Sequence, residues 1–380
     1  MIVHAALPPA HVVPAARRRP PSQVGLGVVL NTSDGGQVFG FDVDQNGTDG
    51  VLASAQTING DGEVLVSMQT FNQNTGAIED TFERYEGLEY EYAVDGIFAG
   101  DTGLVTEYVT PKGSIYATRE FRVMKPVTKN KFDRKWTPPI KDIDIQGAPE
   151  NQINSSTVIL AIELKNNDRP ILFSSDIAKN TFSSVIALDQ NTFGYCVLPQ
   201  VGQYFAGNDA IIALSPDCGA VGGEAPVNYV INLSTGQESS FNGYNNGYYH
   251  AGDVNGMAVD PNTGVGATTT ELNAQVEFYN FATQQPIAYA QLPCTTNVSQ
   301  INSGAGVAYD AVNQLFLVTE PYNACGSGSA LLVYNESGGL VEAITGFQFA
   351  IGEPPPVVNP STRTGWAFGP TFSQLQQFFY

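Results

Sequence analysis

The segment from Asp42 to Gly50, with the sequence DVDQNGTDG, carries the clearest local signal for chemistry in the chain. Acids at its first and third positions, Asn46 at the fifth and a glycine at the sixth match the front half of an EF-hand-type calcium loop. The twelfth position is Ala53 instead of a glutamate, so another carboxylate would have to complete the shell. An Asx-rich hairpin turn explains the same residues, and both interpretations stay open. The candidate calcium ligands are Asp42, Asp44, Asn46 and Asp49.

A second set of acids follows apolar strands, three times as Thr-Glu. If these strands are equivalent, the acids line one face of the molecule, where closely spaced carboxylates bind a hard cation or a cationic partner. Alternatively, each acid accepts hydrogen bonds from turn amides and has a structural role. The members of this predicted ring of carboxylates are Asp42, Glu107, Asp176, Glu224, Glu271 and Glu320, and the last repeat has Pro370 instead.

His250 is the only histidine after residue 22. A zinc site with three histidines is therefore excluded, and no Gly-x-Ser-x-Gly elbow supports a serine hydrolase. The residues around it predict a platform for a sugar or a small organic molecule, although an ordinary polar loop explains them equally. An enzyme would use His250 as acid or base, with Glu271 and Glu320 as further catalytic candidates near a divalent cation. The platform residues are Tyr244, Tyr248, Tyr249, His250 and Asp253.

These candidates are placed by an internal repeat. An apolar strand followed by a polar turn begins seven times, at Val24, Tyr92, Val158, Asp209, Gly256, Gly306 and Pro356. In the fifth unit it leads into four short strands, at 257–260, 265–270, 276–280 and 286–292. Four strands per unit, joined by Asn, Asp and Gly turns, predict an all-β fold, a seven-bladed β-propeller of four-stranded antiparallel blades over residues 23–380. The seventh unit lacks an outer strand, which we expect the N-terminal part of the chain to supply unless it stays missing.

The repeated pattern of glycine, apolar strand and aspartate, together with hairpins such as VYNESGGLVEAI, resembles the seven-bladed lactonase-like and YVTN-type propellers. The resemblance covers roughly residues 23–380 and implies the architecture. That superfamily includes lactonases, lyases and surface-layer proteins, so the resemblance implies no single activity and no catalytic residues.

Composition limits the partners and the location. A formal net charge of -20 excludes nucleic acid as a partner, and no apolar run is long enough to span a bilayer. Residues 1–22 read as a disordered leader or a tail remnant, without a clear signal peptide. The even number of cysteines fits an extracytoplasmic protein with two disulfides, while four free thiols fit equally. The expected pairs are Cys294 with Cys325, on the face of the channel mouth, and Cys196 with Cys218, on the opposite face.

The sequence therefore predicts an exported binding or scaffold protein that acts through an acidic channel mouth. Its expected partner is a small molecule, a glycan or a protein, with calcium as the one cofactor considered and no organic cofactor. Two alternatives stay open: a metal-dependent enzyme of the lactonase or lyase type, and a surface or matrix protein that self-associates through blade edges.

Overall fold

Short runs of β-branched and aromatic residues between Asn, Asp and Gly turns form the strands of this chain. The structure, a computed structural model, describes the backbone of residues 24–45, 47–57, 64–85, 89–99, 102–111, 120–128, 131–136, 143–144, 150–154, 157–164, 169–176, 181–187, 200–205, 210–214, 227–242, 254–270, 275–291, 306–320, 329–348 and 355–380. Side chains are described for residues 24–45, 47–56, 65–82, 103, 228, 230–241, 256–269, 275–290, 306–320, 329–348 and 355–380. All regular elements in these ranges are strands, which confirms the predicted all-β fold.

The strands pair antiparallel into separate sheets, named here in chain order. Sheet 1 contains β2 (Gln37–Val43), β3 (Asp49–Thr57), β4 (Val64–Asn72) and β5 (Ile78–Tyr85). Sheet 2 contains β6 (Glu89–Ala99), β7 (Thr102–Pro111), β8 (Glu120–Thr128) and β9 (Lys131–Trp136). Sheet 3 contains β10 (Ile143–Asp144), β11 (Glu150–Asn154), β12 (Thr157–Leu164), β13 (Arg169–Asp176) and β14 (Thr181–Ala187). Sheet 4 contains β15 (Gln200–Phe205), β16 (Ala210–Leu214), β17 (Val227–Asn232) and β18 (Glu238–Asn242).

The later sheets follow the same order. Sheet 5 contains β19 (Val254–Val259), β20 (Val265–Thr270), β21 (Gln275–Asn280) and β22 (Gln285–Gln291). Sheet 6 contains β23 (Val307–Asp310), β24 (Leu315–Glu320), β25 (Ser329–Asn335) and β26 (Leu340–Phe347). Sheet 7 contains β27 (Val357–Asn359), β28 (Thr364–Phe368), β29 (Gln374–Phe379) and, from the other end of the chain, β1 (Gly25–Asn31).

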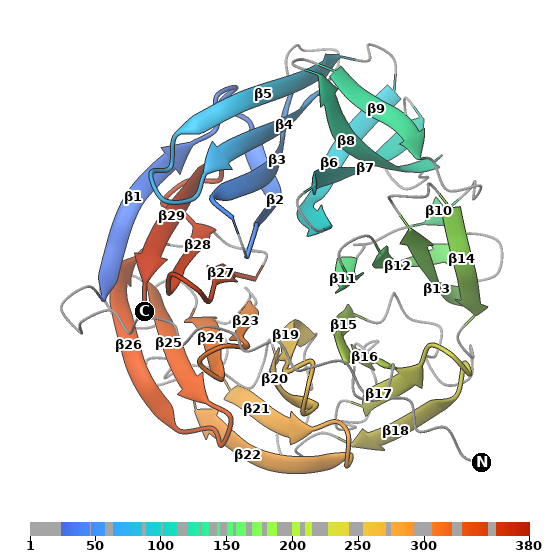
Figure 1. The fold of residues 1–380 in the computed structure, drawn as a ribbon, viewed down its shortest axis with the longest axis vertical. Helices are drawn as coiled ribbons and strands as arrows, with labels where there is room; N and C mark the ends of the chain where they lie inside the picture. The colour runs from blue at the N-terminus through green and yellow to red at the C-terminus, as the bar shows by residue number, and fades with distance from the viewer. Residues whose placement is uncertain are drawn as a thin grey trace, which may run out of the picture.

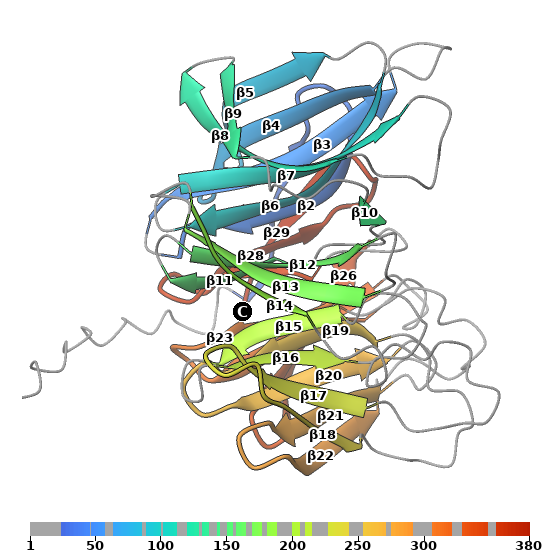
Figure 2. The ribbon, with the colours of Figure 1, turned by 90° about the vertical axis from the view of Figure 1, so that its right-hand side faces the viewer.

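The sheets stand around a common axis as a ring (Figure 1). Their innermost strands contact one another in turn, from β2 through β6, β11, β15, β19, β23 and β27 back to β2. Seen from the side, the sheets stack as successive layers around that axis (Figure 2). Radial stacking of four-stranded sheets is the arrangement of a β-propeller, because each sheet buries both faces against its neighbours.

Closure of the ring confirms one expectation and corrects another. β1 pairs with β29 and forms the outer strand of sheet 7, so the N-terminal part of the chain does supply the missing strand. The interpretation of Val24 as the opening of a first unit is therefore wrong, since sheet 1 opens with β2. The units predicted to open at Val158 and Asp209 are shifted in the same way, because β12 and β16 are second strands.

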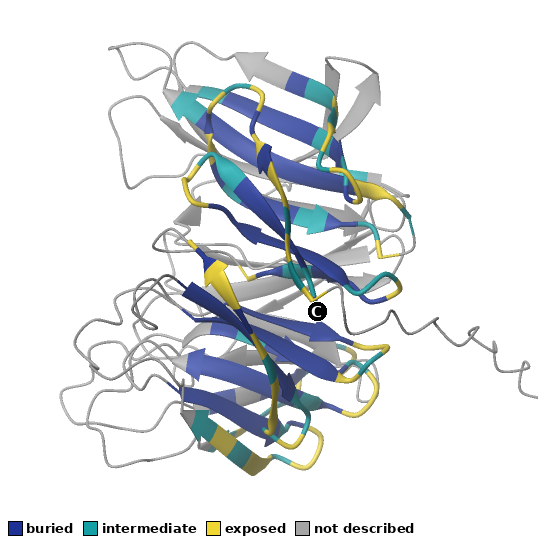
Figure 3. Cartoon of the chain, turned by 90° about the vertical axis from the view of Figure 1, so that its left-hand side faces the viewer, coloured by how far each residue is buried: buried dark blue, intermediate teal, exposed yellow. Residues whose placement is uncertain are grey.

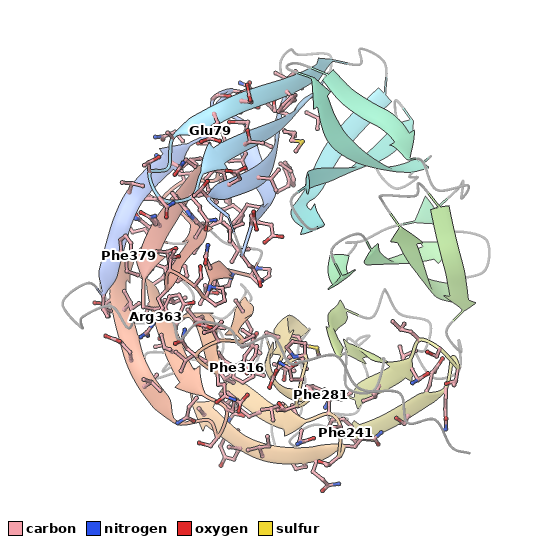
Figure 4. All side chains as sticks on the ribbon, in the orientation of Figure 1. Glu79, Phe241, Phe281, Phe316, Arg363 and Phe379 are labelled. Carbon is pink, nitrogen blue, oxygen red and sulfur yellow. The ribbon has the colours of Figure 1, made fainter. Side chains whose placement is uncertain are left out.

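Aromatic rings fill the space between neighbouring sheets. The ring centroids of Phe278 in sheet 5 and Phe316 in sheet 6 lie 5.8 Å apart, in an edge-to-face arrangement. Phe241 of β18 approaches Phe281 of sheet 5 at 5.7 Å, and Figure 4 labels these two rings and Phe316. Gly266 in the second strand lies under the ring of Phe281, where a Cβ atom would collide. These contacts hold the sheets at a fixed spacing.

The connections between strands lie on two opposite faces of the ring. The turn face carries the hairpin turns that join the first strand to the second and the third to the outer strand. The mouth face carries the remaining connections, of which residues 32–36 and 369–373 are described in full. Within the described residues, no helix has the length and apolarity needed to cross a membrane.

Candidate functional site

The predicted calcium loop is a hairpin turn on the turn face of sheet 1. Asp42 lies within β2, Asp44 follows it, Asp49 begins β3, and Asn46 lies outside the described residues. The Asp44 backbone N–H donates to the Asp49 carbonyl at 2.9 Å and closes the turn.

The side-chain amide of Gln73 binds the backbone of this turn. Its Nε2 donates to the carbonyl oxygens of Asp44 at 2.8 Å and Gly47 at 3.0 Å, and its backbone N–H donates to the carbonyl of Thr48 at 2.7 Å. In an EF-hand-type calcium loop the seventh residue, here Thr48, gives its backbone carbonyl oxygen to the ion, and in this turn that oxygen accepts from the Gln73 backbone N–H. This geometry favours the interpretation as a hairpin turn.

Gln73 also joins sheet 1 to sheet 7. Its side chain is 1% exposed, and its Oε1 accepts a hydrogen bond from Asn359 Nδ2 at 3.0 Å. Its backbone carbonyl accepts from Trp366 Nε1 at 3.2 Å and from Gln377 Nε2 at 2.8 Å. One buried side chain thus connects the turns of the first and last sheets of the ring.

The predicted ring of carboxylates does not come from equivalent positions. Its alignment is wrong at Asp42, which lies in the innermost strand of sheet 1, and at Asp176, which ends the third strand of sheet 3. Glu107 lies within β7, and Glu320 ends β24 as expected. Glu224 and Glu271 fall outside the described residues.

The strand pairing shows that Glu271 and Glu320 do not stand at equivalent sequence positions of their units. Val265 pairs with Asn280 in sheet 5, as Leu315 pairs with Asn335 in sheet 6. Counting from these pairs, Glu320 corresponds to Thr270, so Glu271 lies one residue further along the chain.

The Thr-Glu pair of sheet 6 has a visible structural role. Thr319 Oγ1 accepts a hydrogen bond from the Gly306 backbone N–H at 2.8 Å, in a buried position that ties the first strand to the second. Glu320 is fully buried at the end of β24. Burial, and then the charge of Glu320, raise the pKa of Tyr334 well above its ordinary value.

The polar residues that do recur at equivalent positions follow the innermost strand. Asp260, Asp310 and Asn359 each accept hydrogen bonds from backbone N–H groups two residues on, at 2.9, 2.9 and 3.1 Å. These are Asx turns, and the chain leaves each of them through a residue with positive φ. Those residues are Gly264 (74°), Gln314 (57°) and Arg363 (53°). The sequence signal for these turns was an Asp or Asn followed four residues later by Gly, Gln or Arg. The prediction placed the repeated acids at the end of the second strand, whereas the recurring residues lie at the end of the innermost strand.

Tyrosines bind carboxylates of the turn face, once across a sheet interface and once within sheet 6. Tyr380 Oη in sheet 7 donates to Asp310 Oδ2 in sheet 6 at 2.9 Å, and Tyr309 Oη donates to Glu336 Oε1 at 2.7 Å. Asp260 of sheet 5 lies near this second pair and contributes to the raised pKa values of both side chains. Burial first, then the neighbouring acids, raise the pKa values of Tyr309 and Tyr380, and burial raises the pKa of Glu336. The carboxylates of the turn face therefore connect sheets 5, 6 and 7.

Exposed apolar side chains gather on the outer strands of three neighbouring sheets. We call this set the outer band. It consists of Val24, Leu26, Val28 and Val29 at β1, Ile287 and Tyr289 on β22, and Leu340 and Val341 on β26. Figure 3 shows the exposed residues of the outer strands beside the buried inner strands.

The strands of the outer band come close to one another at two points. A Cβ atom on Gly338, in the turn before β26, would lie 3.0 Å from Ala288 of β22. A Cβ atom on Gly346, near the end of β26, would lie 3.7 Å from Leu26 of β1. β26 contacts β1 and, through the turn before it, approaches β22, so it lies between the other two strands of the band.

Several predicted sites lie outside the described residues. They are the platform Tyr244, Tyr248, Tyr249, His250 and Asp253, the cysteines Cys196, Cys218, Cys294 and Cys325, and the leader 1–22. The enzyme with His250 and Glu271 stays a prediction from the sequence. Among the residues that the structure does describe, no group of three or more His, Cys, Asp or Glu side chains gathers as a metal site.

Comparison with solved structures supports the propeller fold. A chain of the "Crystal Structure of Mitotic Checkpoint Complex" matches with a TM-score of 0.64 and 11% sequence identity, over 98% of this chain and 99% of that chain. At this identity the likeness shows the fold alone. No protein-family model matches the chain, and the search of curated proteins finds no match.

Proposed function

We propose that this β-propeller is a protein-binding scaffold and that the outer band is its binding surface. One observation carries the proposal. Ten large apolar side chains are exposed among the described residues, and eight of them belong to the outer band. Exposed apolar side chains on a soluble protein are normally scattered, and a contiguous patch marks a site of interaction.

The composition of the outer strands supports the same proposal. β1 and β22 contain no charged residue and β26 contains only Glu342, in a chain with 37 acidic residues. The outer strand β5 of sheet 1, by contrast, carries Glu79, which Figure 4 labels at the rim, and Asp80. The cores of protein interfaces are depleted in charge in the same way.

We further propose that the ring has seven blades, within the superfamily of lactonase-like and YVTN-type propellers. The seven sheets among the described strands and the contact of β27 with β2 support this number. Export, calcium binding and a ligand at the acidic mouth stay predictions from the sequence.

Site-specific photocrosslinking in cells that express the chain tests the binding surface. A crosslinking residue in place of Val341 or Tyr289 is expected to give an adduct with the same partner protein. An excess of the chain without the crosslinking residue is expected to reduce the amount of this adduct. The matched control is Val312, which is exposed to 53% on the turn face, against 56% for Val341. Equal adducts at Val341 and Val312 would contradict the proposal.

A further inference from the structure

We infer that the partner of the outer band is a second copy of this chain. The inference rests on the proposed function, since it identifies the protein that the band binds. It follows from the charge of the molecule, the bulge in β1 and the apolar area that the band exposes.

Charge favours a second copy over a basic partner. The net charge of -20 attracts cationic proteins to the molecule in general, but the outer band offers them only Glu342. Two copies repel each other wherever their acidic surfaces meet. They can approach at the outer band, because each copy brings one carboxylate there. A charge-depleted apolar patch is also typical of homodimer interfaces.

The band is suited to contact between side chains more than to addition of a strand. β1 has a bulge between Leu26 and Val29, where Gln376 Nε2 donates to the carbonyl oxygens of Gly27 at 3.1 Å and Val28 at 3.2 Å. Such bulges interrupt the regular row of donors and acceptors that a further strand would need. The apolar side chains of the band remain available, and β26 lies at their centre.

The apolar area limits the size of the contact. The eight side chains are 37–56% exposed, which corresponds to an apolar area on the order of 500 Å² per copy. A two-fold contact would bury on the order of 1,000 Å² in total, at the low end of specific interfaces. We therefore expect a reversible dimer that dissociates on dilution.

Sedimentation velocity over a wide concentration range tests the inference. The wild-type mass is expected to rise from one chain toward two, and high salt is expected to favour the dimer because it screens the repulsion between acidic copies. Val341→Asp is expected to keep the chain monomeric, whereas Val312→Asp dimerises like the wild type. A wild type that stays monomeric at the highest concentration, or variants that behave alike, would overturn the inference.

The crosslinking experiment separates this inference from the proposed function. An adduct at Val341 with the mass of two chains supports both. A monomeric wild type that gives a specific adduct with a different protein at Val341 overturns self-association and leaves the scaffold function in place. A monomeric wild type without any specific adduct overturns both. Melting curves of both aspartate variants establish that each is folded.

Discussion

Gln73 offers the most direct test of the structural argument. Gln73→Ala removes the three shortest side-chain hydrogen bonds of this residue, two to the carbonyl oxygens of Asp44 and Gly47 and one from Asn359, and a longer one of 3.5 Å to the carbonyl of Asp49. At a net value of about 1 kcal/mol for each bond, the loss in unfolding free energy is about 3 kcal/mol. With an unfolding entropy of roughly 2 cal/mol/K per residue, a chain of this size melts about 4 °C lower.

Thermal unfolding followed by circular dichroism measures the effect. Asn74→Ala is the matched control, because this neighbouring side chain is exposed in the same turn and we expect a change within about 0.5 kcal/mol. The same measurement with EDTA and with calcium tests the loop. Since the amide of Gln73 satisfies its carbonyl oxygens, we expect no shift in the wild type. Equal melting of the two variants, or a calcium-dependent rise in the wild type, would refute the reasoning.

Three further substitutions test other contacts. Glu336→Gln removes a carboxyl whose pKa is raised above its ordinary value of 4.5, chiefly by burial. Because the pKa is raised in the folded state, the wild type loses stability as the pH rises through this pKa. The urea midpoint of the variant should therefore increase relative to that of the wild type between acid and neutral pH. A constant difference between the two midpoints over this pH range would contradict the prediction. Tyr380→Phe removes the buried bond to Asp310 and should lower stability by about 2 kcal/mol in urea unfolding, and an unchanged midpoint would argue against the bond. Thr319→Val leaves the buried Gly306 N–H without its side-chain acceptor, and a loss of about 1.5 kcal/mol is expected by the same assay, whereas no loss would mean that water replaces the hydroxyl.

The repeat and the turns could be predicted because their signals are local. The strands of sheets 5 and 6 lie within a few residues of their expected bounds, since alternating apolar residues and Asx turns define them. The assignment of strands to sheets failed where it depends on distant pairing. β1 looks like an innermost strand by its sequence, and only its pairing with β29 makes it an outer one.

The candidate site was predicted less well, for a related reason. A ring of acids requires equivalent positions to within one residue, and eye alignment of strand ends cannot supply that register for Glu271 and Glu320. The outer band was not predicted because the residue types in its strands are those of any other strand in the chain. The signal available was the near absence of charge in β1, β22 and β26 compared with β5.

The pairing of β1 with β29 has a consequence for biosynthesis. Asn31 and Gln374 meet by a side-chain hydrogen bond across a separation of 343 residues. At about 5–20 residues per second, a ribosome needs roughly 20–70 seconds between making these two strands, and closing so long a segment costs about 5 kcal/mol in chain entropy. During that interval β1 is an apolar segment without its partner strand. We therefore expect the last sheet to form late, and expect nascent chains to need protection of β1 until translation is nearly finished.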